Sequence, residues 1–169
     1  MPGYKHMDII QRQHIDYIGN VNDLSFLEDG SVEEIYACHV LEHFKRNETD
    51  LVLAEWCRVL KEGGLLRIAV PDFEAIVSEY SQNGDLNAVL GLLYGGQNYE
   101  YNFHYQAYDF SRLKDILQKT GFADVCKYDW RGFLPDNYDD FSRAYLPHMD
   151  MKNGRLMSLN VMAMKGQAY

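Results

Sequence analysis

The densest group of side chains able to do chemistry lies in the segment H-V-L-E-H-F, residues 39–44. His39, Glu42 and His43 have the H-x-x-E-H spacing that one class of zinc hydrolases uses. On a helix the two imidazoles would lie one turn apart and bind zinc, with Glu42 as the general base. Because the segment begins where a strand is expected to end, His39 is not expected to be helical. We therefore expect no metal site here and keep a zinc hydrolase only as an alternative.

Two acids follow short apolar runs nearer the N-terminus. Asp8 lies in an apolar run at 6–10, and Asp23 follows a second run at 15–21. A carboxylate at a strand end can accept hydrogen bonds from both hydroxyls of a ribose, and an acid at position 23 could accept from an adenine amino group. The alternatives are a solvated acid for Asp8 and a turn or cap residue for Asp23.

A tyrosine-rich stretch at 95–108 contains a further histidine, His104. An imidazole titrates near neutral pH and can serve as a base for a hydroxyl or amine. Tyr101 and Tyr105 belong to the same stretch. They would form either the wall of a pocket or a small satellite core.

These residues need elements that position them, and the hydrophobic pattern predicts alternating strands and helices. Strands are expected at 6–10, 15–21, 31–40, 65–70, 123–128 and 156–164, and helices at 47–61, 73–82, 86–93 and from the cap Asp109 to Gly121. The alternation predicts an α/β fold whose sheet is mostly parallel, and the last two strands, with no helix between them, should be antiparallel. Ligands of such sheets bind at the carboxyl ends of the strands, where Asp8, Asp23, Cys38 and His39 fall.

Composition narrows the class of protein. The 169 residues predict a single domain over 1–169, with irregular insertions at 95–108 and 130–155. The formal net charge of -9 argues against a nucleic-acid partner and against binding to anionic membranes. No apolar run is long enough to span a bilayer. Three cysteines without a C-x-x-C pair indicate free thiols, so we expect a cytoplasmic location.

Three stretches together resemble the class I S-adenosylmethionine-dependent methyltransferases, and in particular small predicted members of the type 11 group. They are DLSFLEDGSVEEIYACHVLEHF (residues 23–44), EWCRVLKEGGLLRIAVPD (residues 55–72) and, more weakly, residues 104–122. The resemblance implies a Rossmann-like methyltransferase sheet. It also implies S-adenosylmethionine as cofactor and methyl transfer to a small-molecule or saccharide-like acceptor.

The resemblance also implies roles for single residues. Asp8 would hold the ribose, Asp23 and Leu24 would flank the adenine, and Cys38 and His39 would line the methionine end. The acceptor side is expected to use the substrate contacts Glu42, Tyr101 and Tyr105 and the catalytic residues His43 and His104. Methyl transfer is an in-line displacement that needs positioning and in some cases a base.

One feature of the family has no counterpart in this sequence. The family begins with a strand and a G-x-G-x-G loop, whereas Gly3 is the only glycine before Gly19 here. In the family that strand lies between the strands that carry Asp8 and Cys38. We therefore expect an N-terminally truncated member in which those two strands pair directly, or in which a homodimer covers the exposed edges. Because the loop is missing, we expect cofactor binding by this truncated member to be weakened or lost. The missing loop also favours an alternative: a non-catalytic binding or assembly module with the methyltransferase fold.

Overall fold

A four-stranded sheet forms the centre of the computed structural model, which describes residue 1 and residues 3–166. Its order is β3 (Val32–Cys38), β4 (Leu60–Pro71), β8 (Ser158–Lys165) and β5 (Phe122–Lys127). β3 and β4 are parallel, and β8 runs antiparallel to both β4 and β5. Three strands therefore share one direction and the last strand opposes them, which confirms the predicted α/β class.

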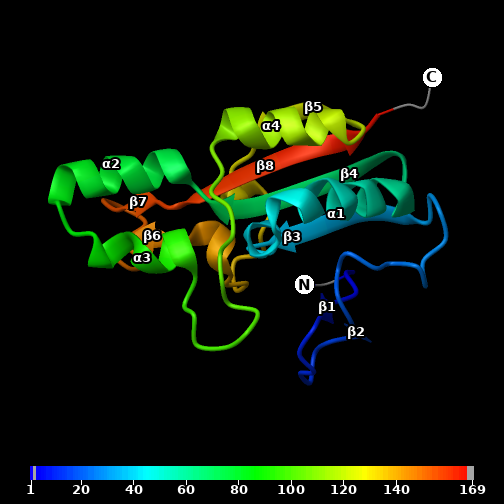
Figure 1. Cartoon of the computed structure of the whole chain (residues 1–169), viewed down its shortest axis with the longest axis horizontal. Coiled ribbons are helices and arrows are strands. Elements are labelled where there is room, and N and C mark those ends of the chain that lie inside the picture. The colour runs from blue at the N-terminus through cyan, green and yellow to red at the C-terminus, as the bar shows by residue number, and fades with distance from the viewer. Residues whose placement is uncertain (2, 167–169) are drawn as a thin grey trace.

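Two helices cover one face of the sheet. α1 (Arg46–Val59) and α4 (Phe110–Lys119) pack their apolar sides onto the strands, as Figure 1 shows. The shared core includes the buried residues Val52, Leu53, Trp56, Leu66, Ile68, Leu113, Leu117 and Val161. Asp109 caps α4 as predicted, since its carboxylate accepts the backbone N–H of Arg112 at 2.7 Å.

The start and end of α1 differ from the prediction. The helix begins after Lys45, whose backbone N–H donates to the Glu48 carboxylate at 2.9 Å, so neither Asn47 nor Thr49 is the cap. It ends at Val59, and the Gly63–Gly64 pair lies inside β4, not at a helix exit. The register with β3 shifts here. Gly63 has a φ of 69°, and a Cβ on Gly64 would lie 2.7 Å from a backbone oxygen. The glycines therefore make an irregularity in the strand that a side chain would block.

The segment 130–155, expected to be irregular, contains short elements that pack on the other side of the strands. It holds η2 (Trp130–Gly132), η3 (Phe141–Arg143) and the short pair β6 (Tyr145–Leu146) with β7 (Arg155–Leu156). Trp130, Leu134 and Tyr145 form its core, which contacts Tyr36 of β3.

α2 (Phe73–Asn83) and α3 (Asn87–Tyr94) lie beyond one end of the sheet (Figure 1). They share a small core of Ala75, Ile76, Val89 and Met157. Between α3 and α4, residues 95–108 run without helix or named strand. Within residues 1 and 3–166, no helix is both long and apolar enough to cross a membrane.

The N-terminal strands are much shorter than expected and lie apart from the sheet. β1 (Met7–Asp8) and β2 (Tyr17–Ile18) pair with each other in parallel as a separate two-stranded unit. Figure 1 shows this unit away from the central strands. β3 is the terminal strand of the large sheet, and no strand of the described chain pairs with its outer edge. The expectation that the strands carrying Asp8 and Cys38 pair directly is therefore wrong.

Candidate functional site

A cavity of about 420 Å³ opens where β1 and β3 end. Residues predicted as site residues from three distant parts of the chain line it together: Asp8, His39, His43, Tyr101 and Tyr105. Asn22 and Val21 from the loop after β2 complete one wall. A cavity of this size at strand ends is typical of a small-molecule site.

Asp8 is held at the end of β1 by the backbone that follows it. Its Oδ1 accepts the backbone N–H of Ile10 at 2.8 Å, which makes a tight turn directly after the strand. The side chain is half-buried and lines the cavity. A carboxylate fixed in this way has remaining lone pairs for a ligand hydroxyl.

His39 leaves β3 with a backbone conformation that is rare for residues other than glycine. Its φ is 52°, while its backbone N–H donates to the carbonyl of Ala69 at 2.8 Å. A buried chain of polar groups on β8 then sets the ring. Asn160 accepts from the Ser158 hydroxyl at 3.1 Å, and the Ser158 oxygen lies 3.3 Å from Nε2 of His39. Because the hydroxyl proton points to Asn160, the Ser158 oxygen accepts the proton of Nε2.

Glu42, predicted as a substrate contact, is fully buried and lines neither the 420 Å³ cavity nor the second cavity described below. It belongs to η1 (Leu41–His43), a single 3-10 turn, so His39 is outside any helix, as predicted. Oε1 of Glu42 lies 3.2 Å from Nδ1 of His39 and 4.0 Å from Nε2 of His104. Burial lowers the pKa of His104, and the nearby Glu42 charge offsets part of that decrease.

The imidazoles of His43 and His104 are in contact and have fixed tautomers. Their ring centroids are 4.8 Å apart and the planes are nearly perpendicular, at 80°. Nδ1 of His43 lies 3.0 Å from the carbonyl of Phe103, and Nδ1 of His104 lies 2.9 Å from the carbonyl of Leu92. A carbonyl only accepts, so both Nδ1 atoms donate and both Nε2 atoms keep a lone pair.

Three predicted cofactor residues do not line the cavity. Asp23 is exposed one residue beyond the lining residue Asn22, and hydrogen bonds from Ser25 lower the pKa of its carboxyl group. Leu24 is buried in the main core. Cys38, the residue before His39, is half-buried, and burial raises the pKa of its thiol.

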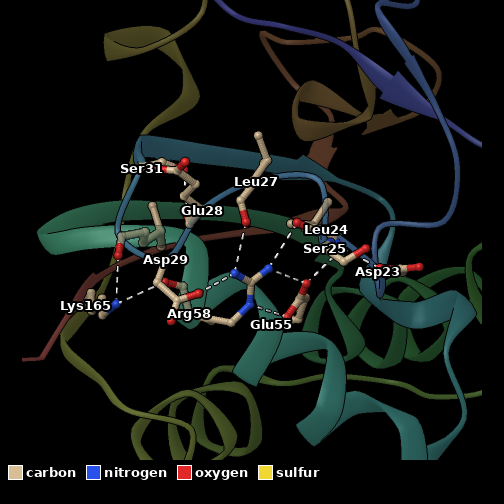
Figure 2. Close-up of polar contacts among 11 residues, drawn as sticks. Asp23, Leu24, Ser25, Leu27, Glu28, Asp29, Ser31, Glu55, Arg58 and Lys165 are labelled. Atoms are coloured by element: carbon tan, nitrogen blue, oxygen red, sulfur yellow. Dashed lines mark hydrogen bonds and ion pairs between the residues drawn. The ribbon is translucent and has the colours of Figure 1, made fainter.

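An arginine of α1 holds the loop that carries Asp23 and Leu24. Figure 2 shows the Arg58 guanidinium between this loop and Glu55. Arg58 donates to the carbonyls of Leu24 and Leu27, each at 3.0 Å, and pairs with Asp29 at 2.6 Å. Glu55 accepts from Arg58 at 2.8 Å and from the backbone N–H of Leu24 at 2.8 Å. The E-x-x-R spacing could have indicated the Glu55–Arg58 pair, although it was not used above, but the loop contacts depend on the fold.

A second cavity, of about 480 Å³, was not predicted. It lies on the other side of His104 and Tyr105, and its lining includes Tyr94, Arg46 and Arg112. The two arginines come from different helices, so their spacing in the sequence does not reveal the site. His104 and Tyr105 therefore lie at the boundary between the second cavity and the region around His43.

Comparison with known proteins identifies the architecture. Residues 6–68 match a family model described as a methyltransferase domain. The chain has a methyltransferase fold. The resemblance to methyltransferases, inferred above from three stretches of sequence, is confirmed at the level of the fold. No curated protein matches the chain.

Several solved methyltransferases share this fold at low sequence identity. A Haloferax volcanii methyltransferase in complex with the Trm112 activator is 14% identical, with a TM-score of 0.54, covering 95% of this chain and 65% of that chain. An Archaeoglobus fulgidus S-adenosylmethionine-dependent methyltransferase is 14% identical, with a TM-score of 0.57 and coverages of 94% and 74%.

The Burkholderia thailandensis 1,6-didemethyltoxoflavin-N1-methyltransferase, solved with 1,6-didemethyltoxoflavin and S-adenosylhomocysteine, is also 14% identical. Its TM-score is 0.58, with coverages of 95% of this chain and 60% of that chain. This methyltransferase fold thus spans less than two thirds of the Haloferax and Burkholderia chains.

Proposed function

We propose that the chain is an S-adenosylmethionine-dependent methyltransferase unit that binds its cofactor in the 420 Å³ cavity. The observation that carries the proposal is that Asp8 and His39, from the ends of two different strands, line the same cavity. The methyltransferase fold supports it, and so does the S-adenosylhomocysteine held by the Burkholderia relative. Ligands of open α/β sheets bind at this edge of the strands.

Each lining group has a chemical match in the cofactor. The Asp8 carboxylate would accept from the ribose hydroxyls, and His39 would lie at the methionine end. Asn22, next to Asp23, has an amide that can both donate to and accept from the edge of an adenine. In this proposal Asp23 and Leu24 belong to the loop that Arg58 holds in place, and Cys38 supports His39 from the preceding position in the chain.

The methyl acceptor would enter from the tyrosine-rich side. Tyr101 and Tyr105 line the cofactor cavity, and the second cavity with Arg46 and Arg112 lies next to Tyr105. The free Nε2 atom of His104 would accept a hydrogen bond from an acceptor hydroxyl or amine and orient it for in-line attack. We propose a small polar acceptor, with the two arginines favouring one that carries a negative group.

Calorimetric titration with S-adenosylhomocysteine tests the cofactor site. We expect wild-type chain to bind one equivalent, and Asp8→Asn to bind at least about tenfold more weakly, because a charge-assisted hydrogen bond to the ribose is lost. Asp115→Asn is the matched control, since Asp115 is an exposed acid of α4 far from the cavity lining.

Two results would contradict the proposal. Equal affinity of wild type and Asp8→Asn would remove the ribose role of Asp8. Absence of binding by folded wild-type chain would instead support the non-catalytic binding module.

A further inference from the structure

The carboxylate of Glu42 is fully buried, yet neither of its oxygens accepts a hydrogen bond from any residue in the described part of the chain. A buried carboxylate without a partner is costly, so proteins protonate it, pair it with a cation or use it as a metal ligand. Nδ1 of His39 lies 3.2 Å from Oε1, which makes an ion pair when the imidazole is protonated but does not have the geometry of a hydrogen bond, and Oε2 has no such neighbour among the ion pairs of the described residues. Glu42 therefore has hydrogen-bonding and ligand capacity, above all at Oε2, that the described protein groups leave unused.

Two imidazoles next to Glu42 are prepared as ligands. His43 and His104 each use Nδ1 to donate to a backbone carbonyl, at 3.0 Å and 2.9 Å, which leaves Nε2 with its lone pair. This is the arrangement found around metal-bound histidines, whose second nitrogen donates to a carbonyl or carboxylate that fixes the ring. The tautomer needed for coordination is thus set by the backbone.

The three side chains also converge in space. Glu42, His43 and His104 each offer one ligand atom, and these atoms lie within 4.8 Å of one another. Tetrahedral coordination at zinc bond lengths would bring such atoms to about 3.4 Å from one another, so their separations need to shorten by up to about 1.4 Å. His43 faces one cavity and His104 the other, so the remaining coordination positions are open to small molecules.

We propose that Glu42, His43 and His104 form a binding site for one divalent transition-metal ion of the zinc and cobalt type. Two imidazoles and a carboxylate suit these borderline ions, whereas Mg²⁺ and Ca²⁺ prefer sets made only of oxygen. The ion would neutralise the buried charge of Glu42. The site differs from the H-x-x-E-H arrangement considered above, because Glu42 is a ligand here and His104 takes the place of His39.

This inference does not depend on the cofactor proposal. An ion here would present its open positions between the two cavities. With the ion bound, Nε2 of His104 is a metal ligand, and the ion in its place would hold an oxygen- or nitrogen-bearing acceptor. The metal titration below contains no S-adenosylmethionine. It therefore fails or succeeds separately from the cofactor titration.

The test is metal binding by untagged, chelator-treated full chain. We expect calorimetry to show that one equivalent of Zn²⁺ binds per chain. Bound Co²⁺ should give visible absorption bands as intense as those of four- or five-coordinate Co²⁺. Mg²⁺ at the same concentration should give no binding signal. Bound Zn²⁺ should also raise the melting temperature of the wild-type chain, because it binds only the folded state.

Two ligand variants, Glu42→Gln and His104→Gln, locate the site. Each should weaken Zn²⁺ binding by at least about tenfold, as loss of even an outer-shell partner does. His14→Gln and His148→Gln are matched controls, because both histidines are exposed and neither belongs to the Glu42 cluster. The near-ultraviolet circular dichroism spectrum of each metal-free variant is compared with that of the wild type. Only a variant with a matching spectrum, and therefore an intact fold, is used to locate the site.

The proposal is overturned if wild-type chain binds no stoichiometric Zn²⁺, a result that needs no variant. It is also overturned if His14→Gln abolishes binding while Glu42→Gln does not, which would move the ion to the surface pair His6 and His14, whose rings are 6.0 Å apart.

Discussion

His39 is the residue at which local strain and the candidate site coincide. Its φ of 52° lies in the left-handed region, where a Cβ is unfavourable, and its ring nevertheless lines the cavity. Strained residues persist where the surrounding structure fixes them, and they gather at functional sites. The bond from the His39 N–H to Ala69 and the buried Ser158–Asn160 pair provide that constraint.

This geometry makes a prediction that separates backbone strain from loss of the ring. His39→Gly and His39→Ala both remove the imidazole, but only glycine adopts the left-handed conformation without strain. We expect the free energy of unfolding of His39→Gly to exceed that of His39→Ala by about 1 kcal/mol, measured by urea denaturation.

The same pair of changes at Asp115, in the middle of α4, is the control and should give the opposite order, with alanine more stable. If His39→Ala were as stable as His39→Gly, the left-handed conformation of His39 would be wrong.

The role of a single residue was predictable from the sequence where that role depends only on neighbouring positions in the chain. Asp109 caps α4 because an acid before an amphipathic run predicts a helix start, and Asp8 was identified as an acid at a strand end. Glu42 was not recognised as a buried, unpartnered group. Its burial depends on η1 and on residues from the tyrosine-rich stretch, which the local pattern does not place.

At the scale of elements, α1 positions the loop 23–29 as well as covering the sheet. The Arg58 guanidinium is bound by two loop carbonyls and two carboxylates, which together fix its direction (Figure 2). A forked donor with five N–H groups is suited to such a set of acceptors, and lysine would not replace it.

Arg58→Met should therefore loosen the loop while α1 remains helical. We expect faster amide hydrogen exchange at Leu24 and Leu27, unchanged exchange in the middle of β4 and weaker binding of S-adenosylhomocysteine. Arg46→Met, an exposed arginine of the same helix, should leave the loop exchange unchanged. Equal exchange at Leu24 in wild type and Arg58→Met would show that the arginine does not hold the loop.

Elements with a strong periodic pattern were predicted within a few residues. The helices α2, α3 and α4 and the strands β3 and β5 are where apolar periodicity and flanking breakers place them. The glycine pair after α1 was misinterpreted, because glycine also marks a strand irregularity and only the register with β3 distinguishes the two. β1 and β2 are short because they pair only with each other.

At the scale of the whole molecule, three parts of the chain meet at one edge of the sheet. The N-terminal unit with Asp8, the turn after β3 and the tyrosine-rich stretch enclose the 420 Å³ cavity. Asp8 and His39 were both expected at carboxyl ends of strands, and they line the same cavity although β1 does not belong to the large sheet. The second cavity, with Arg46 and Arg112, was not predictable, since it depends on how α1 and α4 pack across the stretch 95–108.

The most direct test of the cofactor site maps where S-adenosylhomocysteine binds. In amide ¹H–¹⁵N spectra of the 19.7 kDa chain, titration should shift the signals of residues 7–9, 20–22, 39–45 and 99–105 and leave those of α2 and η2 unchanged. Shifts confined to other surfaces, or no shifts at saturating ligand, would contradict the proposal that this cavity is the cofactor site.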